Sequence, residues 1–494
     1  DDAANAPKGA GVGGLALVAG ASGTNQTNGK FGVDNVVVNG TTYDFEPFAE
    51  PSILPSGGGG GGGAAPTPPP APEGTTDAES ATSTSADGTA TATSGETTVT
   101  AHGEGAFTVS QYPSNPTEPA PVEGQATFFD VLIAEGSSFT SLTITQCDLP
   151  ANAHSIVWFN GTKWLKASSV TYADGCATVT ITDSTSPNLA DLTGTVFAAG
   201  KLPVNRLAGP NRIETAVAVS QHRYPADDSA GAVVLARSDE FTDALAGAPL
   251  ADAHDAPVLL THSDSLSGAT LSEIERVLPD GGTVYLLGGP AALSTSVEQA
   301  LEDAGFVAKR IAGANRYATA VSIAKQLGSP STVLEVPGTN FPDAISAGPV
   351  AATLDGAILL TRGTKPASAT TDYLAAHKGL QRYTIGGISA QADPKAEEVS
   401  GTNRYATSAA VAEKFFDSPT TVNLATGLKF PDALTAGPSA GVPVLLVRGT
   451  GSKLPETVST YLTKASSSAT TLNVFGGDQA VHQDLVDAAA DLLQ

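Results

Sequence analysis

Short apolar runs alternate with longer amphipathic stretches from about residue 201 to residue 494. In the first third of this region, apolar runs at 232–235, 258–260 and 284–287 predict strands, and amphipathic stretches at 241–253, 266–277 and 294–304 predict helices. Strands that alternate with helices are typical of a parallel sheet covered by helices. We therefore expect an α/β fold for the C-terminal part of the chain.

Residues 97–200 follow a different pattern, in which apolar and polar positions alternate with a period of two. The clearest runs are 98–100, 126–133, 141–145 and 177–182, with turn residues between them. Regularly spaced short strands of this kind predict an all-β sandwich domain.

One hairpin stands out within the predicted sandwich. Asn160-Gly161 lies between Trp158-Phe159 and Lys163-Trp164 and predicts a type I′ turn in a hairpin over residues 155–165. Such a hairpin would make Trp158 and Trp164 cross-strand neighbours. The two indoles would then either pack together as part of the structure or form an aromatic platform for a carbohydrate.

The chain before the sandwich predicts less structure. Residues 55–96 are rich in Gly, Pro, Ser and Thr and predict a linker, because this composition cannot bury enough apolar surface to offset chain entropy. Residues 1–54 are expected to form an extended or β segment. Its run 31–38 has the pattern of a strand that adds to the sandwich of a neighbouring copy, which would allow self-assembly.

Four sequence blocks recur three times, in the same order, in the C-terminal region. An Asn-Arg pair marks the first block, Phe-x-Asp the second, Leu-Leu the third and Gly-Gly the fourth. In chain order these are Asn211-Arg212, Asn315-Arg316 and Asn403-Arg404; Phe241 to Asp243, Phe341 to Asp343 and Phe430 to Asp432; Leu259-Leu260, Leu359-Leu360 and Leu445-Leu446; and Gly288-Gly289, Gly386-Gly387 and Gly476-Gly477. This recurrence predicts three tandem units, 201–305, 306–397 and 398–494, each forming one domain.

The four blocks resemble the cell-wall-binding repeat type 2 family, which occurs on surface proteins of Gram-positive bacteria. The resemblance implies three Rossmann-like α/β units around a pseudo-threefold axis, which bind an anionic secondary wall polymer without a covalent bond. It also implies that the polymer is bound through the Leu-Leu pairs, here Leu259, Leu260, Leu359, Leu360, Leu445 and Leu446. The apolar pattern alone predicts that the same six residues are buried in strands.

The recurrent charged residues are further candidates for polymer contact. Each unit has one arginine of the first block and one aspartate of the second: Arg212, Arg316 and Arg404, with Asp243, Asp343 and Asp432. An arginine fork suits phosphate or carboxylate, and three copies would add their weak affinities through effective concentration. The alternative is an Arg–Asp pair that clamps each unit. The third unit also has Glu398 where the others have Arg206 and Arg310, so a symmetric three-site arrangement is not expected.

The charge of the chain restricts its partners. Lys and Arg total 25 against 50 Asp and Glu, for a net charge of −25, which opposes binding to nucleic acid or to an anionic membrane surface. An anionic polymer would require local basic clusters or a bridging divalent cation. The sequence contains no Met and no apolar run long enough to span a membrane, so we expect a processed, extracellular protein of the cell wall or cell surface.

Secretion would allow Cys147 and Cys176 to form a disulfide. No catalytic set accompanies them: the seven His residues lack metal-ligand spacing, and the G-x-S-x-G match at 437–441 has Leu250 and Val350 where the other units align with Ser439. We predict a noncatalytic wall anchor that displays the β domain, without a cofactor of its own. The alternative is a structural subunit of an extracellular filament or surface layer.

Overall fold

The computed structural model describes residues 36–38, 41–43, 66–117, 123–149, 155–168 and 170–493. The chain divides into two compact units, residues 1–63 and 64–494. In the first unit, β1 (Val36–Val38) pairs antiparallel with β2 (Thr41–Tyr43). Strand β1 covers the end of the run predicted at 31–38, and the rest of that run lies outside the described residues.

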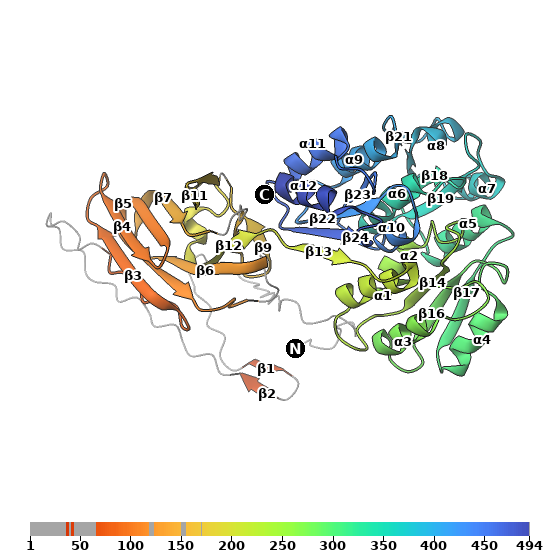
Figure 1. The fold of residues 1–494 in the computed structure, drawn as a ribbon, viewed down its shortest axis with the longest axis horizontal. Helices are drawn as coiled ribbons and strands as arrows, with labels where there is room; N and C mark the ends of the chain where they lie inside the picture. The colour runs from red at the N-terminus through yellow and green to blue at the C-terminus, as the bar shows by residue number, and fades with distance from the viewer. Residues whose placement is uncertain are drawn as a thin grey trace, which may run out of the picture. The chain divides into compact units, whose positions relative to one another are not determined.

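The β domain is one continuous sheet of ten strands (Figure 1). The strands are β3 (Thr76–Ser83), β4 (Thr89–Ser94), β5 (Thr97–Tyr112), β6 (Glu123–Ile133), β7 (Ser138–Gln146), β8 (Ser155–Phe159), β9 (Trp164–Lys166), β10 (Thr171–Ala173), β11 (Cys176–Ile181) and β12 (Thr193–Lys201), with a short 3₁₀ helix at Leu189–Asp191 before β12. The first half of β5 pairs with β4 and β7, and its second half pairs with β3 and β6. Gly103, with φ of 120°, lies where the two halves meet. Both halves contribute to one core, so the predicted sandwich is instead a single curled sheet.

The prediction of a linker over residues 55–96 is wrong from Thr76 onward, because β3 and β4 lie within it. In β4, threonines alternate with small residues. Ala90 and Ala92 point into the core, and the threonines between them face solvent. Thr is β-branched and fits a half-buried pleated surface, whereas the composition of the segment as a whole resembles that of a disordered linker.

The hairpin formed by β8 and β9 has a longer turn than predicted. Phe159 pairs with Trp164, which leaves four residues in the loop, and the Asn160 side chain accepts hydrogen bonds from the backbone N–H groups of Thr162 and Lys163. Trp158 pairs with Leu165, so the two tryptophans lie on opposite faces of the hairpin. Each is only 6% exposed. The prediction of a cross-strand Trp pair is wrong, and neither indole offers a platform to a carbohydrate.

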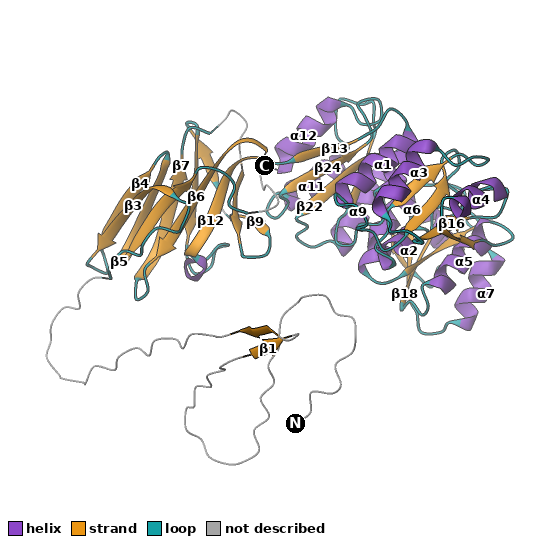
Figure 2. Cartoon of the chain, turned by 90° about the horizontal axis from the view of Figure 1, so that it is seen from below, coloured by secondary structure: helices purple, strands orange, loops and turns teal. Residues whose placement is uncertain are grey.

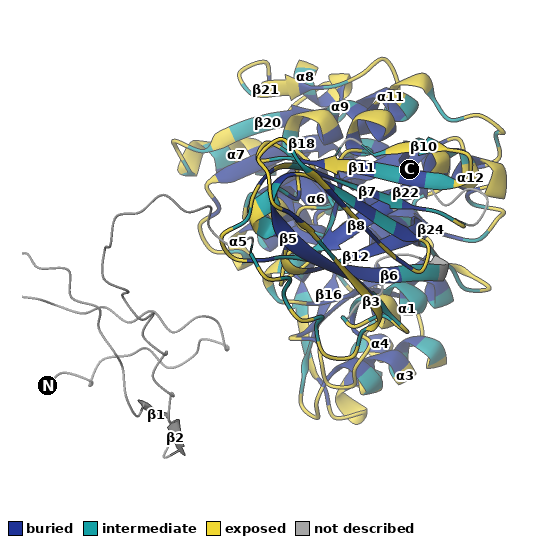
Figure 3. Cartoon of the chain, turned by 90° about the vertical axis from the view of Figure 1, so that its left-hand side faces the viewer, coloured by how far each residue is buried: buried dark blue, intermediate teal, exposed yellow. Residues whose placement is uncertain are grey.

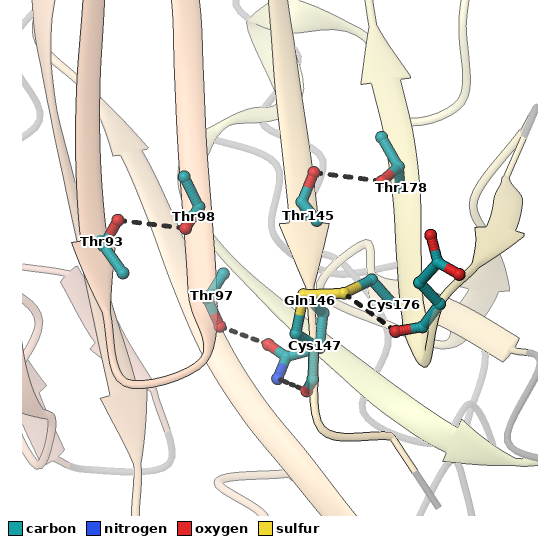
Figure 4. The surroundings of a disulfide bond; sticks show 9 residues. Thr93, Thr97, Thr98, Thr145, Gln146, Cys147, Cys176 and Thr178 are labelled. Atoms are coloured by element: carbon teal, nitrogen blue, oxygen red, sulfur yellow. Dashed lines mark hydrogen bonds between the residues drawn. A yellow bond between two sulfur atoms is a disulfide. The ribbon is translucent and has the colours of Figure 1, made fainter. Parts of the chain in front are cut away.

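The predicted disulfide between Cys147 and Cys176 is present. Cys147 directly follows β7 and Cys176 begins β11, and these strands are antiparallel neighbours (Figure 4). The bond therefore links adjacent strands at one edge of the curled sheet. Rows of threonines continue across the outer face beside it, with hydrogen bonds between Thr93 and Thr98 and between Thr145 and Thr178.

The C-terminal region contains three four-stranded parallel sheets. The first has the order β15 (Val258–Thr261), β14 (Val233–Arg237), β16 (Thr283–Leu287), β17 (Val307–Ile311); the second has β19 (Ala357–Thr361), β18 (Thr332–Pro337), β20 (Gln381–Ile385), β21 (Glu397–Val399); the third has β23 (Val444–Val447), β22 (Thr421–Thr426), β24 (Thr471–Phe475), β13 (Val204–Leu207). The α-helices of the described residues all belong to this region (Figure 2). They are α1 (Arg212–Arg223), α2 (Ala248–Ala253), α3 (Gly268–Val277), α4 (Thr295–Asp303), α5 (Arg316–Gln326), α6 (Pro342–Thr353), α7 (Ser368–Ala376), α8 (Gly387–Ala392), α9 (Arg404–Phe415), α10 (Pro431–Thr435), α11 (Glu456–Ala465) and α12 (Gln483–Leu493).

The sheets are offset from the sequence repeats. Strand β17 continues the first sheet although it opens the second repeat, and β21 does the same for the second sheet. The third sheet is completed by β13 from the start of the region, which pairs in parallel with β24 (Figure 1). The prediction that each repeat forms its own domain is therefore wrong: each sheet borrows a strand from another repeat, and β13 closes the series.

Apolar strand residues form the cores of both parts of the chain. Strands β5, β8 and β12 are largely coloured as buried in Figure 3. In the parallel sheets, strands β14, β15, β19 and β23 are buried on both faces, as their continuous apolar runs predict, whereas the edge strands β13, β17 and β21 are partly exposed. Within the described ranges, no helix combines the length and apolar character needed to cross a membrane.

Candidate functional site

Three equivalent phenylalanines, one from each repeat, contact one another. The ring centroids of Phe241 and Phe341 are 5.8 Å apart, those of Phe241 and Phe430 are 5.5 Å apart, and those of Phe341 and Phe430 are 6.1 Å apart. All three rings are half-buried. We call this cluster the aromatic hub. The phenylalanines follow β14, β18 and β22, so the hub lies where the chain leaves the carboxyl ends of these three strands.

The predicted arginines surround this hub at the starts of helices α1, α5 and α9. In each case the preceding Asn caps the helix by accepting hydrogen bonds from two backbone N–H groups, which fixes the arginine as the first helical residue. Nη1 of Arg212 donates to the carbonyl of Ser238 at 2.7 Å, and Nη1 of Arg316 donates to that of Gly338 at 2.9 Å. Arg404 makes the same bond to Gly427.

Two of the three arginines, Arg212 and Arg404, also reach a ring of the neighbouring sheet. The guanidinium of Arg212 lies 6.0 Å from the ring centroid of Phe430, and that of Arg404 lies 5.8 Å from that of Phe341. These are cation–π distances. Arg212 is exposed, whereas Arg316 and Arg404 are half-buried. Arg212 and Arg404 thus connect consecutive sheets around the hub.

The predicted aspartates lie beneath the arginines, against the glycine that follows the third strand of each sheet. Gly288, Gly386 and Gly476 have φ values of 98°, 88° and 98°, and a Cβ on any of them would collide with the adjacent Asp243, Asp343 or Asp432 carboxylate. Only glycine combines this backbone conformation with so close an approach. The recurrent Gly-Gly block therefore makes room for the aspartate.

Burial changes the titration of two of these carboxyl groups. It raises the pKa of Asp343 to about 6, an effect that the charge of Arg404 opposes. Burial also raises the pKa of Asp432, which a hydrogen bond from Thr215 and the charge of Arg212 oppose. Each aspartate is therefore influenced by the arginine of a different repeat. For these two aspartates the arginine partner lies in another unit, and not in the same unit as the predicted clamp requires.

The six leucines are far from any surface. Leu259, Leu260, Leu359, Leu360, Leu445 and Leu446 lie in β15, β19 and β23 and are 0–1% exposed. A side chain without exposed area cannot contact a polymer directly, so assigning these residues to direct contact is wrong for this fold. They belong to the strand cores, as their apolar pattern predicted.

The position with the reversed charge has a structural role. Arg206 donates hydrogen bonds to the carbonyls of Gly476 and Val481, and Arg310 donates to Gly288 and pairs with Glu298 at 2.8 Å. Glu398 instead accepts a hydrogen bond from Ser400. The first two residues tie the edge strands of the third and first sheets to a Gly-Gly turn, and the second sheet, whose edge strand β21 carries Glu398, shows no such tie among the described residues.

A hollow of about 350 Å³ adjoins Arg212, lined by Asn211, Arg212, Ile213, Glu214, Ser238, His262, Ser267 and Ala269. It places the exposed arginine on the wall of a concave surface. In the described part of the chain, no three His, Cys, Asp or Glu side chains are grouped to hold a metal ion.

Sequence reasoning did not single out the phenylalanines. They were visible as the first residue of the second block, but an isolated Phe before a helix gives no sign that three such rings meet. The hub arises only when the three sheets are packed together.

The three equivalent sheets define an α/β repeat protein, and family comparison agrees with this class. The chain belongs to the family described as cell wall binding domain 2 (CWB2), whose model matches residues 206–298, 310–393 and 398–486, together more than half of the chain. This membership makes it a protein of the cell wall, outside the cell.

Two Bacillus subtilis (strain 168) proteins are similar to this chain. N-acetylmuramoyl-L-alanine amidase LytC is 33% identical over 238 residues, which are 47% of this chain and 47% of that protein. The amidase enhancer is 32% identical over 236 residues, 47% of this chain and 32% of that protein. The chain thus spans half or less of the length of these relatives.

Two solved structures share the fold. Cwp6 from Clostridium difficile aligns with a TM-score of 0.54 and 22% identity, over 72% of this chain and 66% of that one. Cwp8 from Clostridium difficile aligns with a TM-score of 0.53 and 23% identity, over 77% of this chain and 60% of that one. At this identity the likeness concerns the fold alone.

Proposed function

We propose that the aromatic hub and its arginines bind an anionic secondary wall polymer, and that this noncovalent contact anchors the protein and displays its β domain. In this proposal the three sheets and their helices act as Rossmann-like units around a pseudo-threefold axis through the hub. The pairwise contacts of the three equivalent phenylalanines support that arrangement.

The proposal rests on the guanidinium nitrogens of the three arginines that form no hydrogen bond within the described residues. Nη1 of Arg212, Arg316 and Arg404 is fixed to a backbone carbonyl, but Nε and Nη2 have no hydrogen-bond partner within the described residues. These N–H groups can pair with a phosphate or carboxylate in fork geometry. Three such sites within one module would raise the affinity for a repeating polymer through effective concentration.

The net charge of −25 makes local arrangement essential, because the molecule as a whole repels an anion. The three hub aspartates would oppose the polymer when ionised. A divalent cation that bridges an aspartate to the polymer would remove this repulsion, so we propose cation dependence as a second feature of binding. The chain itself would act as a binding protein and not as an enzyme.

Co-sedimentation of the full chain with purified cell walls tests the proposal. Binding should be lost after acid extraction of the secondary polymers, and Arg212→Gln should weaken it several-fold. The control is the exposed Lys464 of helix α11, which pairs with Glu413 of helix α9. Lys464→Gln removes the same charge as Arg212→Gln and should bind normally. Parallel samples with calcium or a chelator test the cation. Wall binding that survives extraction, or that is unaffected by Arg212→Gln, would refute the proposed site.

A further inference from the structure

Neighbouring sheets meet at three junctions. The same two positions of the repeat contribute to each junction, but the residues at these positions differ. Between the second and third sheets, Tyr383 of β20 packs edge-to-face on Phe415 of α9, with ring centroids 5.0 Å apart. Between the first and second sheets, Tyr285 and Leu327 occupy the same positions and belong to one apolar core. At the junction that β13 closes, these positions hold Asn473 and Arg223.

The third junction contains a cavity of about 400 Å³, a size typical of small-molecule sites. Its lining mixes apolar and polar groups from β13, α1, α2, the loop after α10 and β24. The apolar lining is Leu207, Val219, Pro257, Val258, Pro438, Ala440, Val442 and Phe475, and the polar lining is Ser220, His222, Arg223, Asp252, Thr421, Thr435, Ser439 and Asn473. No aromatic-hub residue, hub arginine or hub aspartate is among them, so the cavity is separate from the proposed polymer site.

Two polar atoms at this cavity lack a partner. Ser220 is 0% exposed and its Oγ makes no hydrogen bond, although the other repeats place Ala324 and Ala412 at this position. Nη1 of Arg223 is likewise buried and unpaired, while its Nη2 lies 3.7 Å from Asp252. A buried polar group without a hydrogen-bond partner destabilises the fold. A ligand that supplies hydroxyl oxygens would satisfy both.

We propose that this cavity binds a single uncharged sugar ring. Hydroxyl, amide, guanidinium and carboxylate groups provide donors and acceptors for sugar hydroxyls, and Phe475, Val219 and Leu207 provide apolar surface for the C–H face of a pyranose. Arg223 and Asp252 are the lining residues of opposite charge, and they offset each other. The site therefore favours a neutral ring over an anionic one. This inference does not depend on polymer binding at the hub.

The test uses saturation-transfer NMR on the full chain, with glucose, N-acetylglucosamine and glucuronate as probes. At least one neutral sugar should give saturation transfer and bind more tightly than glucuronate. Ser439→Leu should reduce that affinity at least tenfold, because it introduces the residue that repeat 1 has at this position, Leu250, which is fully buried there. Ser220→Ala, which matches the other two repeats, should reduce it several-fold. Thr460→Leu on the exposed side of α11 is the control and should bind normally.

Two outcomes would overturn the proposal: no saturation transfer to either neutral sugar, or an affinity that Ser439→Leu leaves unchanged. Tighter binding of glucuronate would refute the charge argument. Co-sedimentation of Ser439→Leu with cell walls separates the two sites. Normal wall binding by a variant that has lost the sugar shows that the cavity acts independently of the hub, and failure of wall binding in the native chain leaves the sugar result unaffected.

Discussion

At the scale of single residues, each hub arginine has one guanidinium nitrogen bonded to a backbone carbonyl, and its other nitrogens remain available to a ligand. One nitrogen of Arg316 is fixed by the carbonyl of Gly338, and the stem is fixed by its place at the helix start. A lysine at this position would carry the charge but has no planar fork, so it could not hold the backbone and a ligand in one geometry. Positioning therefore requires arginine here, and so does recognition of the polymer under the proposed function.

Replacing a half-buried hub arginine should lower the free energy of unfolding more than replacing an exposed one. Arg404→Ala removes a carbonyl hydrogen bond and a cation–π contact and leaves Asp343 without its nearby cation. We expect the free energy of unfolding to fall by about 1–3 kcal/mol. Arg212→Ala, at an exposed position, should cost less than about 1 kcal/mol. Urea unfolding of both variants measures this, and an equal loss in the two would contradict the difference in burial.

The raised pKa of Asp343 predicts a specific pH dependence. The carboxyl group has a folded pKa of about 6 against an ordinary value of 3.8, so the native state holds its proton over a range where the unfolded state has released it. The stabilisation is complete below about pH 4 and is lost as the pH rises through about 6; it amounts to at most about 3 kcal/mol. Asp343→Asn removes it.

Urea unfolding of the native chain and of Asp343→Asn at pH 4.5 and pH 7 tests this prediction. The stability of the native chain relative to the variant should increase at the lower pH. Because other buried carboxyl groups are common to both proteins, the difference isolates residue 343. A relative stability that stays constant or decreases at pH 4.5 would contradict the raised pKa.

Recurrence in the sequence revealed the hub arginines, the aspartates and the Gly-Gly turns, since three copies in the same order are visible in one chain. It could not reveal their partners. Arg404 acts on Asp343 of the preceding repeat, and this contact depends on how two sheets pack. The leucines show the converse: the family resemblance assigned them to the polymer, whereas their apolar pattern correctly predicted burial.

At the scale of elements, the errors concern strands whose sequences are locally ambiguous. Strand β4 consists of Thr, Ala and Ser only, a composition shared by linkers, and its burial becomes evident from its pairing with β5. No strand was predicted where β13 lies, and its neighbour β24 lies near the other end of the region. Short-range patterns identify strands well and long-range pairings poorly.

The pairing of β13 with β24 predicts a long-range effect of a small change. Leu207 ends β13, is 8% exposed and packs with Phe475 of β24. Leu207→Ala should destabilise the third sheet by about 2–4 kcal/mol and accelerate amide hydrogen exchange at residues 471–475. Ile311→Ala, at the equivalent and equally buried position of β17, should accelerate exchange in β16 instead. Exchange that changes equally in β16 and β24 for both variants would contradict this assignment.

At the scale of the whole molecule, the ring of three sheets is closed by a strand and not by a covalent link, and the closing junction is the polar one. The other two junctions continue one apolar core, which favours a permanently packed arrangement. The third junction has Asn473 and Arg223 where the other two have aromatic and aliphatic side chains, and it contains a cavity. Threefold repetition in sequence thus gives two structural junctions and one with the composition of a binding site.

The division into two compact units predicts that residues 1–63 can be removed without loss of wall anchoring. The hub, the three sheets and the curled sheet all lie within 64–494. The truncated chain should keep its melting temperature and its co-sedimentation with walls. If the filament hypothesis holds, analytical ultracentrifugation should show concentration-dependent assembly of the full chain that the truncation abolishes. Loss of wall binding on truncation would contradict a hub-centred anchor, whereas assembly that persists without residues 1–63 would move the self-association surface to the curled sheet or the repeats.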